Sequence, residues 1–308
     1  MSKYKSQEFE LKNFLHPKHW LMWIMFGFLR FLSLFPYSFQ LVYGSYIGKL
    51  LKLISKKRRR IVKINLKLCF PDKSDQERQR IMDGCYQNIG ISMLELAICW
   101  WWSDDRLRPL VEIRGQHHVD QALADNKSVI LLSGHFTSLE IGGRLLSLYL
   151  KFQCMYRTQR NQLVDSMLYS KRNSYIEHVV SRKDTRKLLK GIKNLLPTWY
   201  APDQDFRKER NVFAPFLGVP AATITASARL AKSAAGVVLP FYPERKADGS
   251  GYILWILPAL ENFPCGDDVK DATTINASIE YFVRQHPEHY MWIHQRFKSR
   301  PKDEPSVY

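Results

Sequence analysis

Cysteine is scarce in this sequence, and the few cysteines lie far apart. The five residues, Cys69, Cys85, Cys99, Cys154 and Cys265, are odd in number and form no CxxC pair. This pattern argues against a disulfide framework and against a zinc site. It is typical of reduced, mostly buried thiols in a cytosolic compartment.

Acidic residues are also few relative to basic ones. The chain has 308 residues, with 46 Lys and Arg against 29 Asp and Glu, which gives a net charge of +17. This excess predicts an anionic partner, such as nucleic acid, acidic lipid, acidic protein or a phosphorylated substrate. The chain lacks recognition modules such as a zinc finger or an RNP signature, so we expect no nucleic-acid partner.

The sequence also lacks a long uninterrupted apolar run. In the apolar segment from Trp20 to Ile54, the first part ends at Phe35 and is interrupted by Arg30. It falls short of the roughly 20 apolar residues that a spanning helix needs. Its many aromatic residues are typical of a bilayer interface. A spanning helix, an interfacial helix and a buried core helix therefore remain as alternatives, whereas the missing cleavage site argues against a signal peptide.

A basic cluster, "KKRRR" at 56–60, follows this segment directly. Such a cluster after an apolar segment is typical of the cytoplasmic side of a membrane and of contact with anionic lipid. A solvated helix face is the alternative. We expect residues 1–60 to form a membrane anchor with a basic flank, and residues 61–308 to form the main domain.

The sequence after residue 60 predicts helices first and then an alternation of strands and helices. Residues 61–102 have helical periodicity, and Ser74 with Glu77 forms a capping box. The later strands are expected at 128–133, 153–158, 197–202, 236–242 and 252–260, and the helices at 138–150, 161–176, 182–196, 222–234 and 271–286. This order predicts an α/β fold with a mainly parallel sheet flanked by helices.

One stretch, "LLSGHFTSLEIGG" at 131–143, places His135 just after a buried strand. Ligands of open α/β sheets bind beyond the carboxyl ends of the strands. Glu140, in the next helix, can meet His135 only if the histidine lies on the preceding turn. Such a pair suits deprotonation of a hydroxyl by an imidazole that a carboxylate orients. Taken alone, the spacing favours a core histidine over this catalytic pair.

Further stretches carry a resemblance to a known family. They are "FLHPKHWLMW" (14–23), "INLKLCFPD" (64–72), "GHFTSLEIGGR" (134–144), "MYRTQRNQL" (155–163), "WYAPDQDF" (199–206), "FAPFLGVPAATIT" (213–225), "GSGYILWI" (249–256) and "YMWIHQRFKSRP" (290–301). Over nearly its whole length the chain resembles the bacterial lipid A late acyltransferases, which act on Kdo2-lipid IVA. The resemblance implies a glycerolipid acyltransferase-like sandwich, in which His135 and Glu140 are the catalytic dyad of an HX4E motif.

The resemblance also implies roles for other polar residues. Arg172 is expected to contact the anionic acceptor, with a plain surface arginine as the alternative reading and Arg157 as the competing candidate. Asp203 and Asp205 are expected to help hold the acceptor headgroup or Arg172. Two carboxylates without a nearby histidine are poor evidence for a metal, so we expect no metal ion.

The implied reaction moves a fatty acyl group, with laurate favoured, from acyl carrier protein onto a hydroxyl of Kdo2-lipid IVA in lipopolysaccharide biosynthesis. The carrier thioester is the co-substrate, and no other cofactor is expected. The expected place is the cytoplasmic face of the bacterial inner membrane, on anionic lipid. A glycerol-phosphate-type acyltransferase, an acyl thioesterase and a non-catalytic basic membrane-surface protein are the alternatives.

Overall fold

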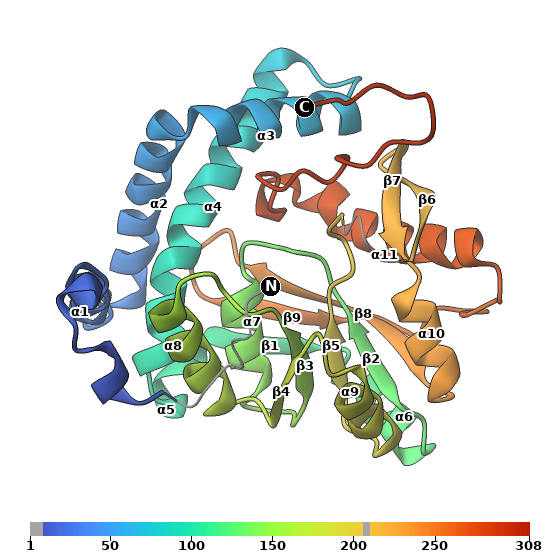
Figure 1. Cartoon of the computed structure of the whole chain (residues 1–308), viewed down its shortest axis with the longest axis horizontal. Helices are drawn as coiled ribbons and strands as arrows, with labels where there is room; N and C mark the ends of the chain where they lie inside the picture. The colour runs from blue at the N-terminus through green and yellow to red at the C-terminus, as the bar shows by residue number, and fades with distance from the viewer. Residues whose placement is uncertain (1–8, 206–209) are drawn as a thin grey trace.

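The computed structural model describes residues 9–205 and 210–308, and its N-terminal part is helical (Figure 1). The elements in order are η1 (Leu11–Phe14), η2 (Pro17–His19), α1 (Trp20–Leu32), α2 (Tyr37–Ile54), α3 (Lys56–Cys69), α4 (Asp75–Trp101), α5 (Asp104–Leu107) and η3 (Arg108–Leu110). The capping box is confirmed, because the Ser74 hydroxyl accepts the Glu77 N–H and the Glu77 carboxylate accepts the Ser74 N–H. The helical prediction for 61–102 is therefore confirmed over α3 and α4.

The N-terminal apolar segment forms two separate helices, because Pro36 interrupts it between α1 and α2. Across residues 9–205 and 210–308, no helix combines the length and the apolar character that crossing a bilayer requires. The expected boundary between residues 60 and 61 falls within α3.

Helix α2 packs closely on α4 through small residues. A Cβ added to Gly48 would lie 2.0 Å from the Tyr86 carbonyl oxygen, and one added to Gly90 would lie 2.1 Å from the Gly44 carbonyl oxygen. The two backbones approach this closely because none of the three positions carries a side chain. Since the small side of α2 faces α4, its large apolar side chains, among them Tyr46 and Leu53, are left exposed.

The second half of the chain builds a seven-stranded sheet in the order β1-β9-β8-β2-β5-β3-β4. Its strands are β1 (Val111–Arg114), β2 (Val129–Leu132), β3 (Gln153–Tyr156), β4 (His178–Ser181), β5 (Thr198–Tyr200), β8 (Val237–Arg245) and β9 (Tyr252–Ile256). Only the β8–β9 pair is antiparallel in this sheet. The predicted α/β fold with a mainly parallel sheet is therefore confirmed.

Helices cover both faces of the sheet, as Figure 1 shows. They are α6 (Gln116–Ala124), α7 (Leu139–Leu146), α8 (Gln162–Asn173), α9 (Thr185–Lys193), α10 (Ala226–Ser233) and α11 (Asp268–Gln285), with η4 (Pro287–His289) after them. Ile130 of β2 belongs to the apolar cluster that includes Leu188 of α9 and Ile279 of α11. Its neighbour Leu131 belongs to the cluster of α7 and α8, because successive strand residues point to opposite faces.

The helix predicted for 222–234 is wrong at its start. Residues Val219–Ile224 form β7, which pairs antiparallel with β6 (Asn211–Phe216), and α10 begins only at Ala226. The strand begins with Val219-Pro220 and has two alanines at its centre, and neither Pro nor Ala is typical of a strand. The sequence interpretation also missed β1 and β4, which are four-residue strands at the two edges of the sheet.

Candidate active site

His135 lies on the turn between β2 and α7, at the carboxyl end of a central strand. Its ring atom Nδ1 is 2.5 Å from Oδ1 of Asp203, and its backbone N–H donates to Oδ2 of the same carboxylate at 2.8 Å. The Asp203 side chain is buried, whereas about a quarter of the His135 side chain is exposed. One carboxylate therefore fixes both the ring and the backbone of His135.

The two residues meet because their strands are neighbours. β2 and β5 run parallel with Leu132 beside Tyr200, so both chains leave the sheet at the same edge. Gly134 permits the close approach, because a Cβ there would lie 2.9 Å from the Ile279 side chain and 3.4 Å from Oδ2 of Asp203. The backbone of Gly134 is not in the left-handed region, so the position requires space rather than conformational freedom.

The pKa of Asp203 shows which ring nitrogen of His135 carries a proton. Burial alone would raise the pKa of Asp203, but the charge and hydrogen bonds of His135, with a further bond from Tyr290, hold that pKa well below its usual range. Asp203 is therefore an anion that can only accept hydrogen bonds, so Nδ1 of His135 carries a proton. In the neutral imidazole this leaves Nε2 as the basic atom.

A segment near the C-terminus, residues 286–294, holds the same turn from the other side. Met291 donates its N–H to the His135 carbonyl at 3.0 Å, and Thr137 donates to the His289 carbonyl at 2.8 Å. The Tyr290 hydroxyl donates to Oδ2 of Asp203 at 2.8 Å. Burial, followed by the charge of Asp203, raises the pKa of Tyr290 well above its ordinary value, so this hydroxyl remains a donor.

A second imidazole lies against the first. The ring centroids of His135 and His294 are 5.7 Å apart in an edge-to-face arrangement. Burial, with the charge of His135, lowers the pKa of His294 to about 4. His294 is therefore neutral at physiological pH and adds no positive charge beside His135.

Glu140 lies in the first turn of α7 and takes a different partner. Its carboxylate accepts two hydrogen bonds from the Arg172 guanidinium, one of them from Nε at 3.2 Å. The guanidinium carbon of Arg172 also lies 5.3 Å from the centre of the Tyr156 ring. Desolvation lowers the pKa of Arg172, but the charge and hydrogen bonds of Glu140 outweigh it and raise that pKa above its ordinary value.

The other predicted residues lie at the same edge of the sheet or near it. The Asp205 carboxylate accepts bonds from the backbone N–H and the hydroxyl of Ser299, at 2.5 and 2.9 Å. Arg157 is exposed just beyond the end of β3. Among the side-chain hydrogen bonds and ion pairs of the described residues, His135 pairs with Asp203 and Glu140 pairs with Arg172. The two members of the HX4E pair thus have separate partners.

Comparison with known proteins identifies the family. Residues 8–299 match the family described as bacterial lipid A biosynthesis acyltransferase. The chain belongs to this family. Lipid A biosynthesis lauroyltransferase of Escherichia coli K12 is 35% identical to it over 295 residues, which cover 96% of each chain. The palmitoleoyltransferase of the same strain is 34% identical, covering 96% of this chain and 97% of its own, and the myristoyltransferase is 27% identical, covering 96% and 93%.

The sequence interpretation of this acyltransferase missed two residues of the site, Tyr290 as a partner of Asp203 and His294 as a neighbour of His135. Both come from the irregular segment after α11, which has no helical or strand period. The prediction named Asp203, which follows the strand expected at 197–202, but did not place it beside the imidazole. Placing it there requires the order of strands in the sheet.

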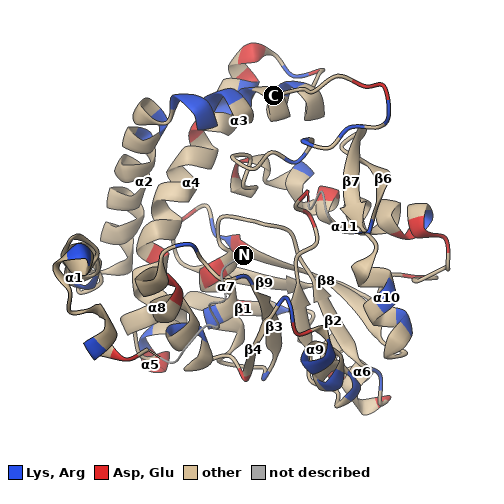
Figure 2. Cartoon of the chain, in the orientation of Figure 1, with Lys and Arg blue, Asp and Glu red and all other residues tan. Residues whose placement is uncertain are grey.

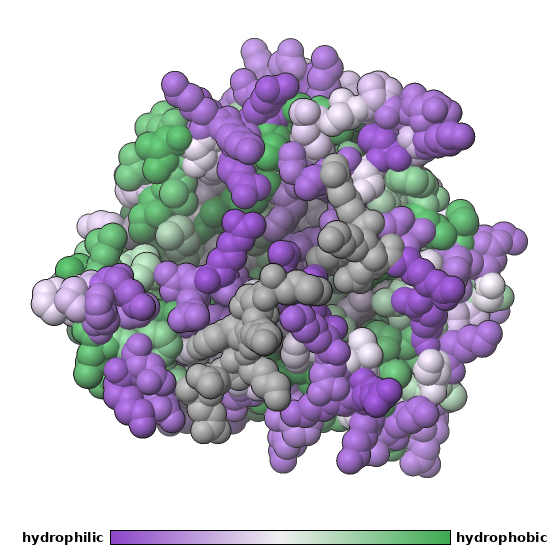
Figure 3. All heavy atoms as spheres, in the orientation of Figure 1, coloured by the Kyte–Doolittle hydropathy of each residue, from purple (hydrophilic) through white to green (hydrophobic). Residues whose placement is uncertain are grey.

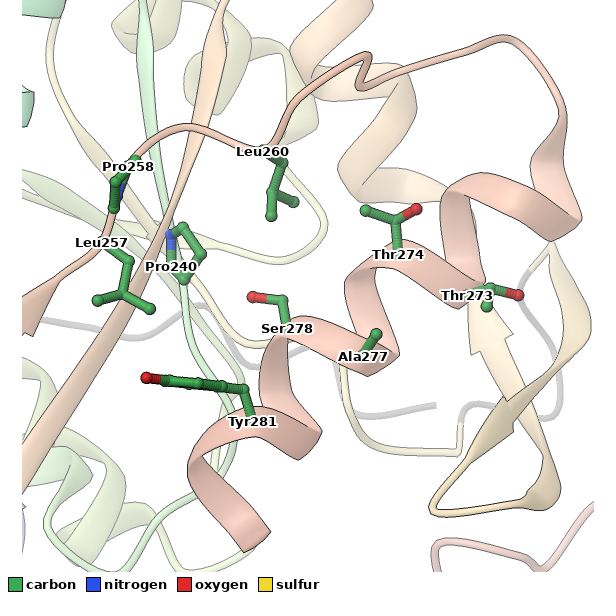
Figure 4. A pocket seen from close by; sticks show the side chains of 9 residues that line it. All are labelled: Pro240, Leu257, Pro258, Leu260, Thr273, Thr274, Ala277, Ser278 and Tyr281. Atoms are coloured by element: carbon green, nitrogen blue, oxygen red, sulfur yellow. The ribbon is translucent and has the colours of Figure 1, made fainter. Parts of the chain in front are cut away.

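The acyltransferase also has a mostly apolar groove of about 470 Å³ between α11 and the chain that follows β9 (Figure 4). It is lined by Pro240, Leu257, Pro258, Leu260, Thr273, Thr274, Ala277, Ser278 and Tyr281. None of these is one of the six predicted site residues. Within the described part of the chain, no three His, Cys, Asp or Glu side chains are grouped so that they could hold a metal ion.

Proposed function

We propose that this acyltransferase moves a fatty acyl group from acyl carrier protein onto a hydroxyl of an acyl chain of Kdo2-lipid IVA, with His135 as the general base. One observation carries the proposal: a partly exposed imidazole is held through Nδ1 by a buried carboxylate at the carboxyl edge of the sheet. This arrangement leaves Nε2 as the atom that takes a proton, which is what activation of a hydroxyl requires.

The proposed reaction is a direct transfer. Nε2 of His135 takes the proton of the acceptor hydroxyl while the hydroxyl oxygen forms a bond to the thioester carbonyl carbon. The tetrahedral intermediate collapses as the carbon–sulfur bond breaks, and the imidazolium returns the proton to the leaving thiolate. The products are the new ester and the free carrier thiol. Asp203 stabilises the imidazolium between these steps and holds its orientation.

In this proposal the Glu140–Arg172 pair binds the acceptor glycolipid and does not orient His135. A guanidinium has five N–H donors in a planar fork, and Glu140 occupies only part of that fork. The remaining donors suit phosphate or another anionic group of the glycolipid. Glu140 then acts as the group that fixes the guanidinium in place. Arg157, exposed at the end of the neighbouring β3, is a second cation for the same headgroup.

The proposed donor chain is laurate. The two relatives that are 35 and 34% identical are named for lauroyl and palmitoleoyl transfer, and the one that is 27% identical is named for myristoyl transfer. The order of similarity supports the lauroyl and palmitoleoyl branch.

We further propose that α1 and α2 lie in the surface of the bilayer that contains the acceptor. Most of the exposed large apolar side chains of the described residues lie between 11 and 54. On these two helices they are Trp20, Leu21, Ile24, Met25, Phe28, Phe31, Val42, Tyr43, Tyr46, Leu50, Leu53 and Ile54. Figure 3 shows this apolar surface along the side of the molecule formed by α1 and α2. Contiguous apolar surface of this kind marks an interaction site, and an interfacial helix fits it without a span.

The basic run at the start of α3 continues this surface (Figure 2). Lys56, Lys57, Arg58 and Arg60 are exposed there, where they can meet anionic headgroups. The proposed place is therefore the cytoplasmic face of the bacterial inner membrane.

The test is mass spectrometry of Kdo2-lipid IVA incubated with the protein and a panel of acyl carrier protein thioesters. The expected product carries one additional acyl ester, formed fastest from the lauroyl thioester. Thioester hydrolysis that is equally fast without the acceptor would identify a thioesterase. Acylation of glycerol 3-phosphate instead of the glycolipid would identify the glycerol-phosphate type. Either result would overturn the proposed function.

A further inference from the structure

Helix α9 presents a mainly basic outer side. Its Leu188, Gly191 and Ile192 are buried against the sheet. The exposed positions of the helix and of the turn before it include Lys183, Arg186, Lys187, Lys190 and Lys193, which we call the α9 basic face. None of these cations takes part in an ion pair with another described residue. Figure 2 shows the concentration of basic residues on this helix.

The one acid within this stretch, Asp184, offsets only part of the positive charge. Asp184 caps the helix, because its Oδ1 accepts the N–H of Lys187 at 3.0 Å. The Asp184 carboxylate is thereby hydrogen-bonded to the first turn of α9. The α9 basic face therefore presents its cations to solvent without an acidic partner among the described residues.

The start of α9 lies at the edge of the sheet where His135 lies. β4 ends at Ser181, and Asp184 begins the helix three residues later. β4 is three strands from β2 in the order β2-β5-β3-β4. At a spacing of about 4.8 Å between neighbouring strands, that separation is roughly 14 Å across the sheet. A thioester at the end of a flexible prosthetic arm can reach His135 from a carrier docked at this distance.

The α9 basic face is separate from the basic surface of α3. In Figure 2, α3 and α9 lie at opposite ends of the molecule, and α1 lies far from α9. The α3 cations adjoin the exposed apolar side chains of α2, whereas α9 has no exposed large apolar side chain. A bilayer that contacts α1 and α2 leaves α9 in water, where a soluble acidic protein rather than lipid is the matching partner.

We propose that the α9 basic face docks the acidic carrier protein that delivers the acyl thioester. This inference rests on the proposed function, because that function supplies the carrier as donor. Exposed charges of this kind act mainly on the rate of encounter. Their effect falls with salt, since the Debye length shrinks from about 30 Å at 0.01 M to about 8 Å at 0.15 M.

The test compares two double variants with the same change in net charge. Arg186→Glu/Lys190→Glu reverses two cations one helical turn apart on α9. Lys270→Glu/Lys302→Glu reverses two exposed cations elsewhere and is the matched control. For each protein, kcat/KM is measured with lauroyl-acyl carrier protein and with lauroyl-pantetheine, at low and at physiological salt, together with binding to vesicles of phosphatidylethanolamine and phosphatidylglycerol.

The α9 variant is expected to lose about tenfold in kcat/KM with the carrier thioester at low salt, and less at physiological salt. Its kcat/KM with lauroyl-pantetheine, its vesicle binding and its melting temperature should match those of the control. An unchanged value with the carrier thioester overturns the docking assignment and leaves the proposed function intact. An equal loss with lauroyl-pantetheine, or weakened vesicle binding, also overturns it. If the wild-type protein transfers no acyl group from lauroyl-acyl carrier protein, both proposals are overturned.

Discussion

His135 and Asp203 are 68 residues apart in the sequence, yet two hydrogen bonds join them, from the ring and from the backbone of the histidine. The double contact fixes the position of the imidazole as well as its tautomer. A carboxylate five residues further on, in the first turn of the next helix, could act on the ring alone. Asp203 also ties the turn after β2 to the end of β5, so the geometry of the base depends on the packing of the sheet.

Replacing Asp203 with Asn keeps the shape of the side chain and removes its charge. We expect kcat to fall by about 10²- to 10⁴-fold, because the imidazolium loses its counter-charge and the tautomer is no longer enforced. The acid limb of the pH profile of kcat/KM should move to lower pH. Steady-state kinetics over pH checks both effects, with circular dichroism as the control for folding. Activity within a few fold of wild type would contradict this role for Asp203.

Replacing Glu140 with Gln distinguishes the role of Glu140 from that of Asp203. We expect the free energy of unfolding to fall by about 1–3 kcal/mol, because a partly buried guanidinium loses its partner. The variant Glu140→Gln/Arg172→Met should recover part of that loss, because it removes the unpaired charge. Urea denaturation measures both changes. The pH profile of kcat/KM should keep its wild-type shape in Glu140→Gln, and a shifted acid limb there but not in Asp203→Asn would restore Glu140 as the partner of the base.

His294 should make the protein sensitive to mild acid. Its pKa is lowered to about 4 in the folded state, so between about pH 6.5 and pH 4 the unfolded chain binds a proton that the folded chain does not. The contribution of His294 to the free energy of unfolding should therefore fall by up to about 3 kcal/mol over this window and level off below it. His289, whose pKa burial lowers to about 3, acts in the same direction. The variant His294→Gln should flatten the measured curve, and an unchanged slope would contradict the assignment.

The apolar surface of α1 gives a prediction for membrane binding. Leu21, Ile24 and Phe28 lie on one side of the helix and are exposed. Changing all three to Ser should weaken binding to vesicles of phosphatidylethanolamine and phosphatidylglycerol by at least about tenfold, because burial of each contributes on the order of 1 kcal/mol or more. Tyr149→Ser/Phe213→Ser/Tyr281→Ser changes three exposed side chains elsewhere and serves as the control. Equal binding by the two variants in a flotation assay would argue against an interfacial role for α1.

Local signals predicted much of the fold. The buried run before His135 predicted β2, and the spacing of Ser74 and Glu77 predicted the start of α4, because both depend on nearby residues. The short edge strands β1 and β4 gave no such signal. The hairpin of β6 and β7 was missed for the same reason, since its small residues have no clear period of two.

The partners within the site depend on contacts between distant elements. His135 and Asp203 were both placed at strand ends, but their pairing requires β2 beside β5, which the sequence alone does not specify. Glu140 was placed on the correct helix, and its pairing with Arg172 follows from the positions of α7 and α8 against the sheet. Tyr290 reaches Asp203 from a segment held by β-type contacts with the His135 turn.

The central claim is that His135 removes the proton of the acceptor hydroxyl. The most direct measurement is the single-turnover rate of lauroyl transfer from lauroyl-acyl carrier protein to Kdo2-lipid IVA, by wild type and by His135→Ala. The account predicts a loss of at least about 10²- to 10⁴-fold in the variant, the range that a general base contributes, with the melting temperature near that of wild type. A rate for folded His135→Ala within about tenfold of wild type would contradict it.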